Sequence, residues 1–146
     1  MYDADCPACS ETYATFHIVH DDLDPYAVSQ QLELQPTEAI RKGDVRNPKA
    51  RRPYIYKRGG WRFRTESVVQ SRDIRRHVDW LLDQLEPSSA QLKRLQAEGY
   101  EMEVFCYWVC AGEHGGPRLS PAQMRRLADL GIEIGFDIYF TGDDED

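Results

Sequence analysis

The cysteines carry the clearest motif for metal chemistry in this sequence. Cys6-Pro7-Ala8-Cys9 has the C-x-x-C spacing of thiolate pairs that bind zinc, and Cys106 and Cys110 are the other two cysteines. Those two lie four residues apart in an apolar segment typical of a strand, which separates them by roughly 13 Å at about 3.3 Å per residue. One zinc ion cannot bind both. We therefore expect free thiols and no metal or other cofactor, and Cys6 and Cys9 are kept as a low-priority zinc pair.

The histidines do not complete a metal site or a catalytic site. His17 and His20 lie three apart in a predicted strand and therefore point to opposite faces of the sheet. His17 is typical of a core or sheet-surface histidine, and His77 lies beside the apolar stripe of a predicted helix. His114 lies in a glycine-rich loop without an obvious serine or cysteine partner. The G-x-S-x-G, P-loop and H-E-x-x-H motifs are also missing, so we expect no catalytic activity.

Asp137 is an acid in the middle of a strongly apolar predicted strand, with Tyr139 next to it on the same face. A carboxylate in such surroundings can have a raised pKa and a functional role. It can also form a structural ion pair with Arg62 or Arg64, and we favour this second interpretation.

Charge is distributed unevenly along the chain. From Arg41 to Arg64 there are ten basic residues and one acid, Asp44, so this segment carries +9 and the rest of the −7 chain carries −16. We expect the segment to pair with acids of its own chain, of a second copy or of an acidic partner protein. A small anionic ligand would satisfy the same charges.

Single-stranded nucleic acid is an alternative partner for this basic segment. Arginines interleaved with Tyr54 and Tyr56 are typical of platforms on which bases stack. Alternation, however, predicts that Trp61 and Phe63 face the core, which removes them as stacking surfaces. The net charge of −7 also disfavours nucleic acids and anionic membranes as partners.

The length of 146 residues fits a single domain with a core large enough to be stable without disulfides. No stretch approaches the roughly 18 apolar residues of a membrane span, and the first thirty residues contain no export signal. We therefore expect a cytoplasmic protein whose cysteines stay reduced. Residues 1–11 are expected to be an irregular arm, 12–140 the folded core and 141–146 an acidic disordered tail.

Helix signals are strong at three places. Asp24-Pro25 and Ser120-Pro121 each combine a capping side chain with proline at the first helical position, and Gln123 completes a capping box. Ser71 is the predicted cap of a helix whose apolar stripe repeats with a period of 3.6 residues. The expected elements are a strand over 13–19, a helix from Asp24 to about Leu34, a loop over 37–53, a hairpin of strands 54–56 and 61–64 turning at Lys57–Gly60, helices over 74–85 and 88–98, a strand over 100–110, a helix over 121–130 and a strand over 132–140.

This order predicts an α+β fold with ferredoxin-like layering. Two βα units and the basic hairpin would form a single, mainly antiparallel sheet, with the helices packed on one face. Ile134, Phe136, Ile138 and Phe140 would then face the helices. The second face would carry Phe105, Tyr107, Val109 and Tyr139, and we expect a second subunit, a ligand or the hairpin to cover it.

Several short motifs resemble one known family. They occur in the right order from about residue 13 to residue 140: Leu23-Asp24-Pro25, Leu34-Gln35-Pro36-Thr37, Arg41-Lys42-Gly43-Asp44, Trp61, Leu130-Gly131-Ile132 and Phe136-Asp137-Ile138-Tyr139. Together they resemble the bacterial family known as domain of unknown function 4279. The resemblance implies a small bacterial protein made of this one domain, and it implies no activity, cofactor or catalytic residue.

The sequence thus predicts a binding or interaction domain that dimerises through the open sheet face. The alternative is an enzyme or binding protein for a small anionic molecule, which would use Asp137, Tyr139 and the loop from Arg41 to Asp44. The candidate binding residues are Arg41, Lys42, Asp44, Arg62, Arg64, Asp137 and Tyr139.

Overall fold

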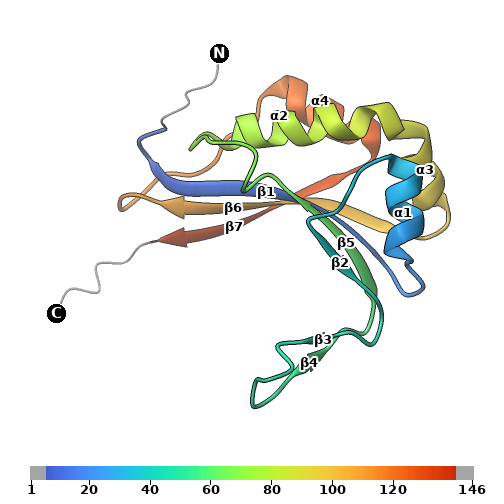
Figure 1. The fold of residues 1–146 in the computed structure, drawn as a ribbon. Helices are drawn as coiled ribbons and strands as arrows, with labels where there is room; N and C mark the ends of the chain where they lie inside the picture. Colours follow the sequence, from blue (N-terminus) through green and yellow to red (C-terminus); the bar gives the residue numbers. More distant parts are fainter. Residues whose placement is uncertain (1–5, 141–146) are drawn as a thin grey trace.

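The computed structural model describes residues 6–140 (Figure 1). The predicted tail 141–146 and the first five residues of the predicted N-terminal arm lie outside this range. No helix between residues 6 and 140 has the length and apolar character of a membrane span. The elements in chain order are β1 (Cys9–His20), α1 (Pro25–Leu32), β2 (Glu38–Ile40), β3 (Val45–Arg46), β4 (Tyr54–Ile55), β5 (Gly59–Arg64), α2 (Ile74–Leu85), the 3₁₀ turn η1 (Glu86–Ser88), α3 (Ser89–Ala97), β6 (Glu101–Cys110), α4 (Pro121–Leu130) and β7 (Glu133–Phe140).

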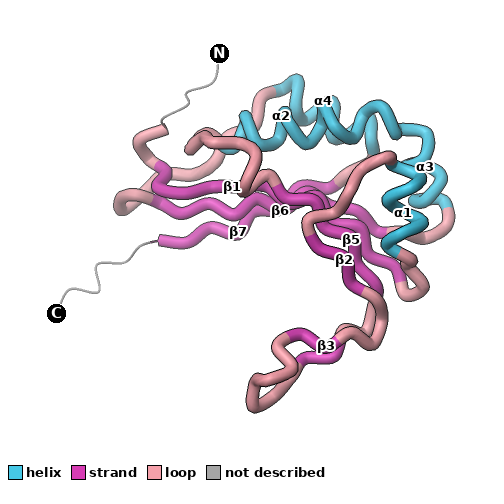
Figure 2. Tube along the Cα trace, viewed as in Figure 1, coloured by secondary structure: helices cyan, strands magenta, loops and turns pink. Residues whose placement is uncertain are grey.

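Five strands form one sheet in the order β2-β5-β1-β6-β7, and β3 and β4 form a separate pair. Neighbours in the five-stranded sheet are antiparallel except β6 and β7, which are parallel and connected through α4. A parallel pair needs such a crossover connection. The helices lie together on one face of the sheet (Figures 1 and 2), so the predicted α+β fold is confirmed.

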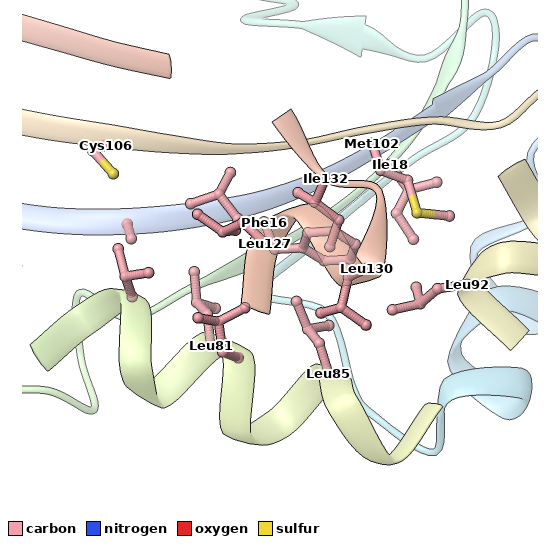
Figure 3. Close-up of a cluster of buried hydrophobic side chains, with 14 of the residues drawn as sticks. Phe16, Ile18, Leu81, Leu85, Leu92, Met102, Cys106, Leu127, Leu130 and Ile132 are labelled. Atoms are coloured by element: carbon pink, nitrogen blue, oxygen red, sulfur yellow. The ribbon is translucent and has the colours of Figure 1, made fainter. Parts of the chain in front are cut away.

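The core lies between this sheet and the helices. Alternation along β1 buries Ala14, Phe16 and Ile18 completely. The facing layer is the apolar stripe of α2, where Leu81 and Leu85 point toward the sheet (Figure 3). Each side chain of leucine or phenylalanine size contributes about 1.5–3 kcal/mol when it is fully buried. This packing determines which face of the sheet is covered and leaves the other face open.

The helix caps are partly as predicted. Ser120 Oγ accepts a hydrogen bond from Gln123 N, and Gln123 Oε1 accepts one from Ser120 N, both at 3.1 Å, so the capping box of α4 is confirmed. The predicted cap of α2, Ser71, is wrong. Asp73 caps this helix instead, because its carboxylate accepts from Arg75 N at 3.0 Å. An ionised cap also interacts favourably with the helix dipole.

Ser120→Ala should lower the free energy of unfolding by about 1 kcal/mol, because it removes the acceptor for the backbone N–H of Gln123. Urea unfolding followed by circular dichroism measures this loss. Ser67→Ala, at an exposed turn, is the matched control and should change stability by less than about 0.5 kcal/mol. Equal midpoints for the two variants would contradict the proposed cap.

The predicted hairpin between residues 54–56 and 61–64 is wrong. β4 pairs with β3, whereas β5 pairs with β1 and β2. Gly59 and Gly60 lie inside β5 and are buried, and a Cβ on Gly59 would lie 2.9 Å from Cβ of Leu23. Glycine is therefore required for the close approach of the β1–α1 connection and not for a tight turn.

Residues 41–58, called the basic arm, contain the β3–β4 pair. The predicted loop over 37–53 is therefore partly wrong, because it contains β2 and β3. Ile40 and Gly60 are paired across β2 and β5, so they close the base of the arm. The arm projects away from the helices (Figure 1), and its strand residues Val45 and Ile55 are 46% and 59% exposed. The arm therefore contributes little to the core.

The last strand is less buried than its alternation predicts. Ile134 packs partly against the core, but Phe136, Ile138 and Phe140 are 40%, 40% and 57% exposed. They share the helix-covered face with the buried residues of β6, as predicted. β7 is the last strand of the sheet, and the helical layer covers its beginning but not its end.

Candidate functional site

The uncovered side of the five-stranded sheet, called the open face, carries the candidate site. The strand register places aromatic residues of β1, β6 and β7 toward one end of this face, and His17 of β1 with charged residues of β5 and β6 toward the other. The side chains that form it are Tyr13, Thr15, His17, Arg62, Arg64, Glu103, Phe105, Tyr107, Asp137 and Tyr139.

Three tyrosines form the aromatic end. The Tyr13 and Tyr107 rings stack with centroids 4.8 Å apart and an interplanar angle of 28°, and Tyr107 lies 5.4 Å from Tyr139. The Tyr139 hydroxyl donates a hydrogen bond to Asp137 Oδ2 at 2.9 Å. This bond to a carboxylate raises the pKa of Tyr139. The result is an aromatic surface with one carboxylate at its edge.

Arg62 and Arg64 form the charged end with Glu38 of β2. Their guanidinium groups lie 3.2 and 3.1 Å from the same oxygen, Glu38 Oε2. The predicted ion pair between these arginines and Asp137 is therefore wrong. β5 and β7 are separated by β1 and β6, which puts their backbones roughly 14 Å apart at about 4.8 Å per strand. Glu38 is on the strand next to the arginines and is the nearer partner.

His17 lies beside the arginines, paired by register with Arg62 and Glu103. Burial, followed by the positive charge of Arg62, lowers the pKa of His17 to about 4. The imidazole is therefore neutral at pH 7. A histidine with this pKa can form hydrogen bonds in the site but is a poor general base, because catalysis of proton transfer is best with a pKa near the working pH.

The open face is hollowed between its two ends. A cavity of about 290 Å³ is lined by Tyr13, Thr15, His17, Arg62, Arg64, Glu103, Phe105, Tyr107 and Asp137. Phe105 is 38% exposed on its floor, and a Cβ on the neighbouring Gly135 would lie 3.4 Å from the Phe105 ring. The volume is close to the lower limit of about 300 Å³ for small-molecule sites. A single ring would fit, with polar groups available at both ends.

The sequence pattern of the family described as Domain of unknown function (DUF4279) matches residues 10–141. The chain belongs to the DUF4279 family. All residues that line the hollow fall within the matched range. No match was found among curated proteins or among solved structures.

In this DUF4279 domain, part of the basic segment pairs with acids outside it. Arg58 lies 2.8 Å from Asp21 and 2.6 Å from Glu101, and Arg41 lies 2.9 Å from Asp24. The other six cations of the basic arm form no ion pair with any residue between 6 and 140: Lys42, Arg46, Lys49, Arg51, Arg52 and Lys57.

The structure separates the two halves of the predicted anion site. Asp44 Oδ2 accepts a hydrogen bond from Arg41 N at 2.8 Å, and Arg41 in turn binds Asp24 before α1. This loop follows β2, at one edge of the sheet, whereas Asp137 and Tyr139 lie on β7 at the other edge. Of the predicted binding residues, the hollow therefore brings together Arg62, Arg64 and Asp137 only.

The four cysteines of the DUF4279 domain form no disulfide between residues 6 and 140. Cys9 N donates to the carbonyl of Cys6 at 3.2 Å, so this pair forms a turn that leads into β1. β1 therefore begins inside the predicted irregular arm, and Cys9 pairs by register with Cys110. Burial raises the pKa of Cys9 and raises that of Cys106 to about 12. Between residues 6 and 140, no three potential ligands converge on a metal site.

Sequence reasoning missed four contributors to the site, Tyr13, Thr15, Glu38 and Glu103. Tyr13 is predictable in retrospect, because the buried residues Ala14 and Phe16 leave the odd positions of β1 on the open face. Glu38 has no such signal, since a three-residue strand shows no periodicity. The prediction that Trp61 and Phe63 face the core is confirmed: Trp61 is fully buried and Phe63 packs against the core.

Proposed function

We propose that this protein is a binding domain without catalytic activity and that its open face takes a small aromatic anion. The observation that carries the proposal is the hollow, with an aromatic floor between an arginine pair and a carboxylate. A ring bound on Phe105 and the tyrosines would gain dispersion and stacking energy. This proposal keeps a small anionic molecule as the ligand, as in the alternative from the sequence. The site retains Asp137, but the residues that line the hollow replace Tyr139 and the loop from Arg41 to Asp44.

The arginine pair would recognise the anionic group. Each guanidinium has five N–H donors, and the bonds to Glu38 use one donor of Arg62 and one of Arg64. Glu38 also holds both side chains in place, which lowers the entropic cost of binding. Asp137, at the far end, would accept a hydrogen bond from a hydroxyl or amino group on the ring. The best ligand therefore has a carboxylate at one end and a donor at the other.

Binding is favoured over catalysis by the protonation chemistry of the site. The pKa of His17 is lowered to about 4, which makes it a poor base at neutral pH. Asp137 already accepts a hydrogen bond from Tyr139. We also place the protein in the cytoplasm, where reducing conditions would keep its four thiols free.

Para-hydroxybenzoate is the probe that combines the ring, the anion and the donor. In a titration followed by nuclear magnetic resonance, the amide chemical shifts of residues of β1, β5 and β6 around the hollow should change. Benzoate should bind more weakly because it lacks the hydroxyl donor. Phenol and acetate should bind more weakly still, because phenol lacks the carboxylate and acetate lacks both the ring and the donor. Arg64→Gln should weaken para-hydroxybenzoate binding at least tenfold, since hydrogen bonds to charged groups contribute about 1.5–3 kcal/mol.

Arg125→Gln, on the exposed side of α4, removes the same charge away from the hollow and should leave the affinity unchanged. Equal effects of the two substitutions, or shifts outside the open face, would overturn the proposal. A short single-stranded oligonucleotide tests the other alternative. Micromolar binding at physiological salt, with shifts in the basic arm and loss on truncating Tyr54, would favour nucleic acid instead.

A further inference from the structure

The outer edge of β7 is long and unprotected. β7 has eight residues and pairs in continuous register with β6 only, so within residues 6–140 its other backbone edge has no strand partner. The opposite edge strand, β2, has three residues. Natural edge strands are usually short or bulged, or carry proline or charged side chains, above all lysine, because a long free edge recruits further strands. β7 is long and pairs without a bulge, it has no proline or lysine, and its two acids, Glu133 and Asp137, both lie on the open side of the sheet.

Apolar side chains are exposed along this edge on both faces of the sheet. Phe136, Ile138 and Phe140 are 40%, 40% and 57% exposed on the helix side, and Tyr139 is 50% exposed on the open side. Removing such surface from water stabilises an association. A partner strand would therefore satisfy backbone groups and cover apolar side chains in the same contact.

We propose that the occupant of this edge is β7 of a second copy, paired antiparallel about a two-fold axis at Phe136. The two sheets would then form one continuous ten-stranded sheet. On the helix side this register places Phe136 opposite its own copy and Ile134 opposite Ile138 of the second chain. All of these residues are apolar, so the strip becomes covered along its length.

The same register also separates the acids on the open side. Glu133 would face Tyr139 of the second chain, and Gly135 would face Asp137. A two-fold axis at Asp137 would instead place two carboxylates opposite each other, and an axis at Gly135 would place Glu133 opposite Asp137. Like charges directly opposite one another destabilise a strand pair. The register at Phe136 avoids both contacts and overlaps nearly the whole strand.

This dimer differs from the dimer predicted through the open face. The charged and hollowed half of the open face is poorly suited to burial against itself, whereas the β7 edge is apolar and complementary to its own sequence. In the proposed dimer both open faces stay accessible and lie on the same side of the continuous sheet. The proposed dimer is therefore compatible with ligand binding at the hollow.

Sedimentation equilibrium from about 1 μM to about 1 mM tests the proposal over a range that covers weak and moderate self-association. The full chain should approach twice its mass of 16.9 kDa. Phe136→Lys should stay monomeric or dimerise at least tenfold more weakly, because two lysines would then face each other. Met124→Lys is the matched control: this residue is 51% exposed on α4, and its substitution should leave the dimer intact.

Charge complementation tests the register itself. Phe136→Glu alone should also be monomeric, and an equimolar mixture with Phe136→Lys should restore a dimer containing one chain of each. Circular dichroism checks that both variants fold. If either variant does not fold, a mixed-label sample of the unmodified protein replaces this experiment, and intermolecular nuclear Overhauser contacts between Phe136 rings are then expected. A monomeric unmodified protein, a dimer insensitive to Phe136→Lys, or a mixture without rescue would each overturn the proposal.

Discussion

Replacing Trp61 by alanine should lower the free energy of unfolding by about 3–5 kcal/mol, the usual cost of removing a buried aromatic side chain. Trp61 is fully buried, and its ring contacts Phe16 and Phe63 edge-on at centroid distances of 6.2 and 5.7 Å. Its Nε1 donates to Ser29 Oγ at 3.0 Å, which fixes α1 against β5. The substitution leaves a cavity and also removes this hydrogen bond. Both effects act in the same direction.

Urea midpoints measured by tryptophan fluorescence and circular dichroism give this loss. Trp80→Ala is a suitable comparison. Trp80 is only partly buried, so its replacement should lower the free energy of unfolding by less. Ser29→Ala removes only the hydrogen-bond partner of Trp61, and should cost about 1 kcal/mol. A loss below about 1 kcal/mol for Trp61→Ala would mean that β5 does not pack as described.

The second large effect concerns acid. The free energy of unfolding should fall as pH is lowered from about 6.5 toward 4, because two histidines have lowered pKa values in the folded state. Burial is the main cause for both, and the pKa of His17 is lowered from 6.5 to about 4. Between these values the unfolded chain binds more protons than the folded chain, so protons favour unfolding. Their stabilising contribution is complete above pH 6.5 and is lost below it.

His77 shows why the folded state resists protonation. The ring is 1% exposed, its Nδ1 lies 2.6 Å from Thr65 Oγ1, and its Nε2 lies 2.8 Å from the carbonyl of Ser71. A carbonyl can only accept, so Nε2 carries the proton and Nδ1 accepts from the Thr65 hydroxyl. That hydroxyl oxygen already accepts from Ala14 N at 3.0 Å. A proton on Nδ1 would force the hydroxyl to reorient.

Urea unfolding at about pH 7, 6, 5 and 4 measures the effect, and His17→Gln isolates one histidine. For His17 the loss should not exceed about 3 kcal/mol, at about 1.36 kcal/mol per pKa unit, and solvent screening reduces it. Carboxylates such as Glu86, whose pKa is lowered mainly by its hydrogen bond to Arg126, contribute equally to both chains and cancel in the comparison. Identical pH profiles for His17→Gln and the unmodified chain would contradict the assignment.

Local signals in the sequence were sufficient for most of the fold. The cap of α4 is determined by residues within one helical turn, so Ser120 and Gln123 are predictable without any knowledge of the rest. The apolar stripe of α2 has the same local character. Strand pairing does not: Gly59 and Gly60 are typical of a turn in sequence, but in space a Cβ on Gly59 would lie 2.9 Å from Leu23 and a Cβ on Gly60 would lie 3.2 Å from His17 Nε2. The misassigned hairpin follows from this difference.

The residues of the site were also predictable from local sequence, but their spatial partners were not. The arginines and Asp137 were predicted as candidates from their residue types, and the strand alternation placed them on one face. Their partners depend on sheet order, and β5 and β7 are not neighbours. Neither the pairing with Glu38 nor the hollow beside Phe105 has a signature within a short window of sequence.

The closed base of the basic arm has a consequence for how such proteins can diverge. Because Ile40 and Gly60 are paired across β2 and β5, the chain leaves the sheet and returns to it at nearly the same point. The intervening residues can therefore be lengthened, shortened or exchanged without altering the path of any sheet strand, as is usual for insertions at exposed loops. The arm is thus a position at which new recognition specificities can evolve on an unchanged scaffold. The six cations of the arm that form no ion pair within residues 6–140 can be exchanged in the same way, because no contact with the core depends on them.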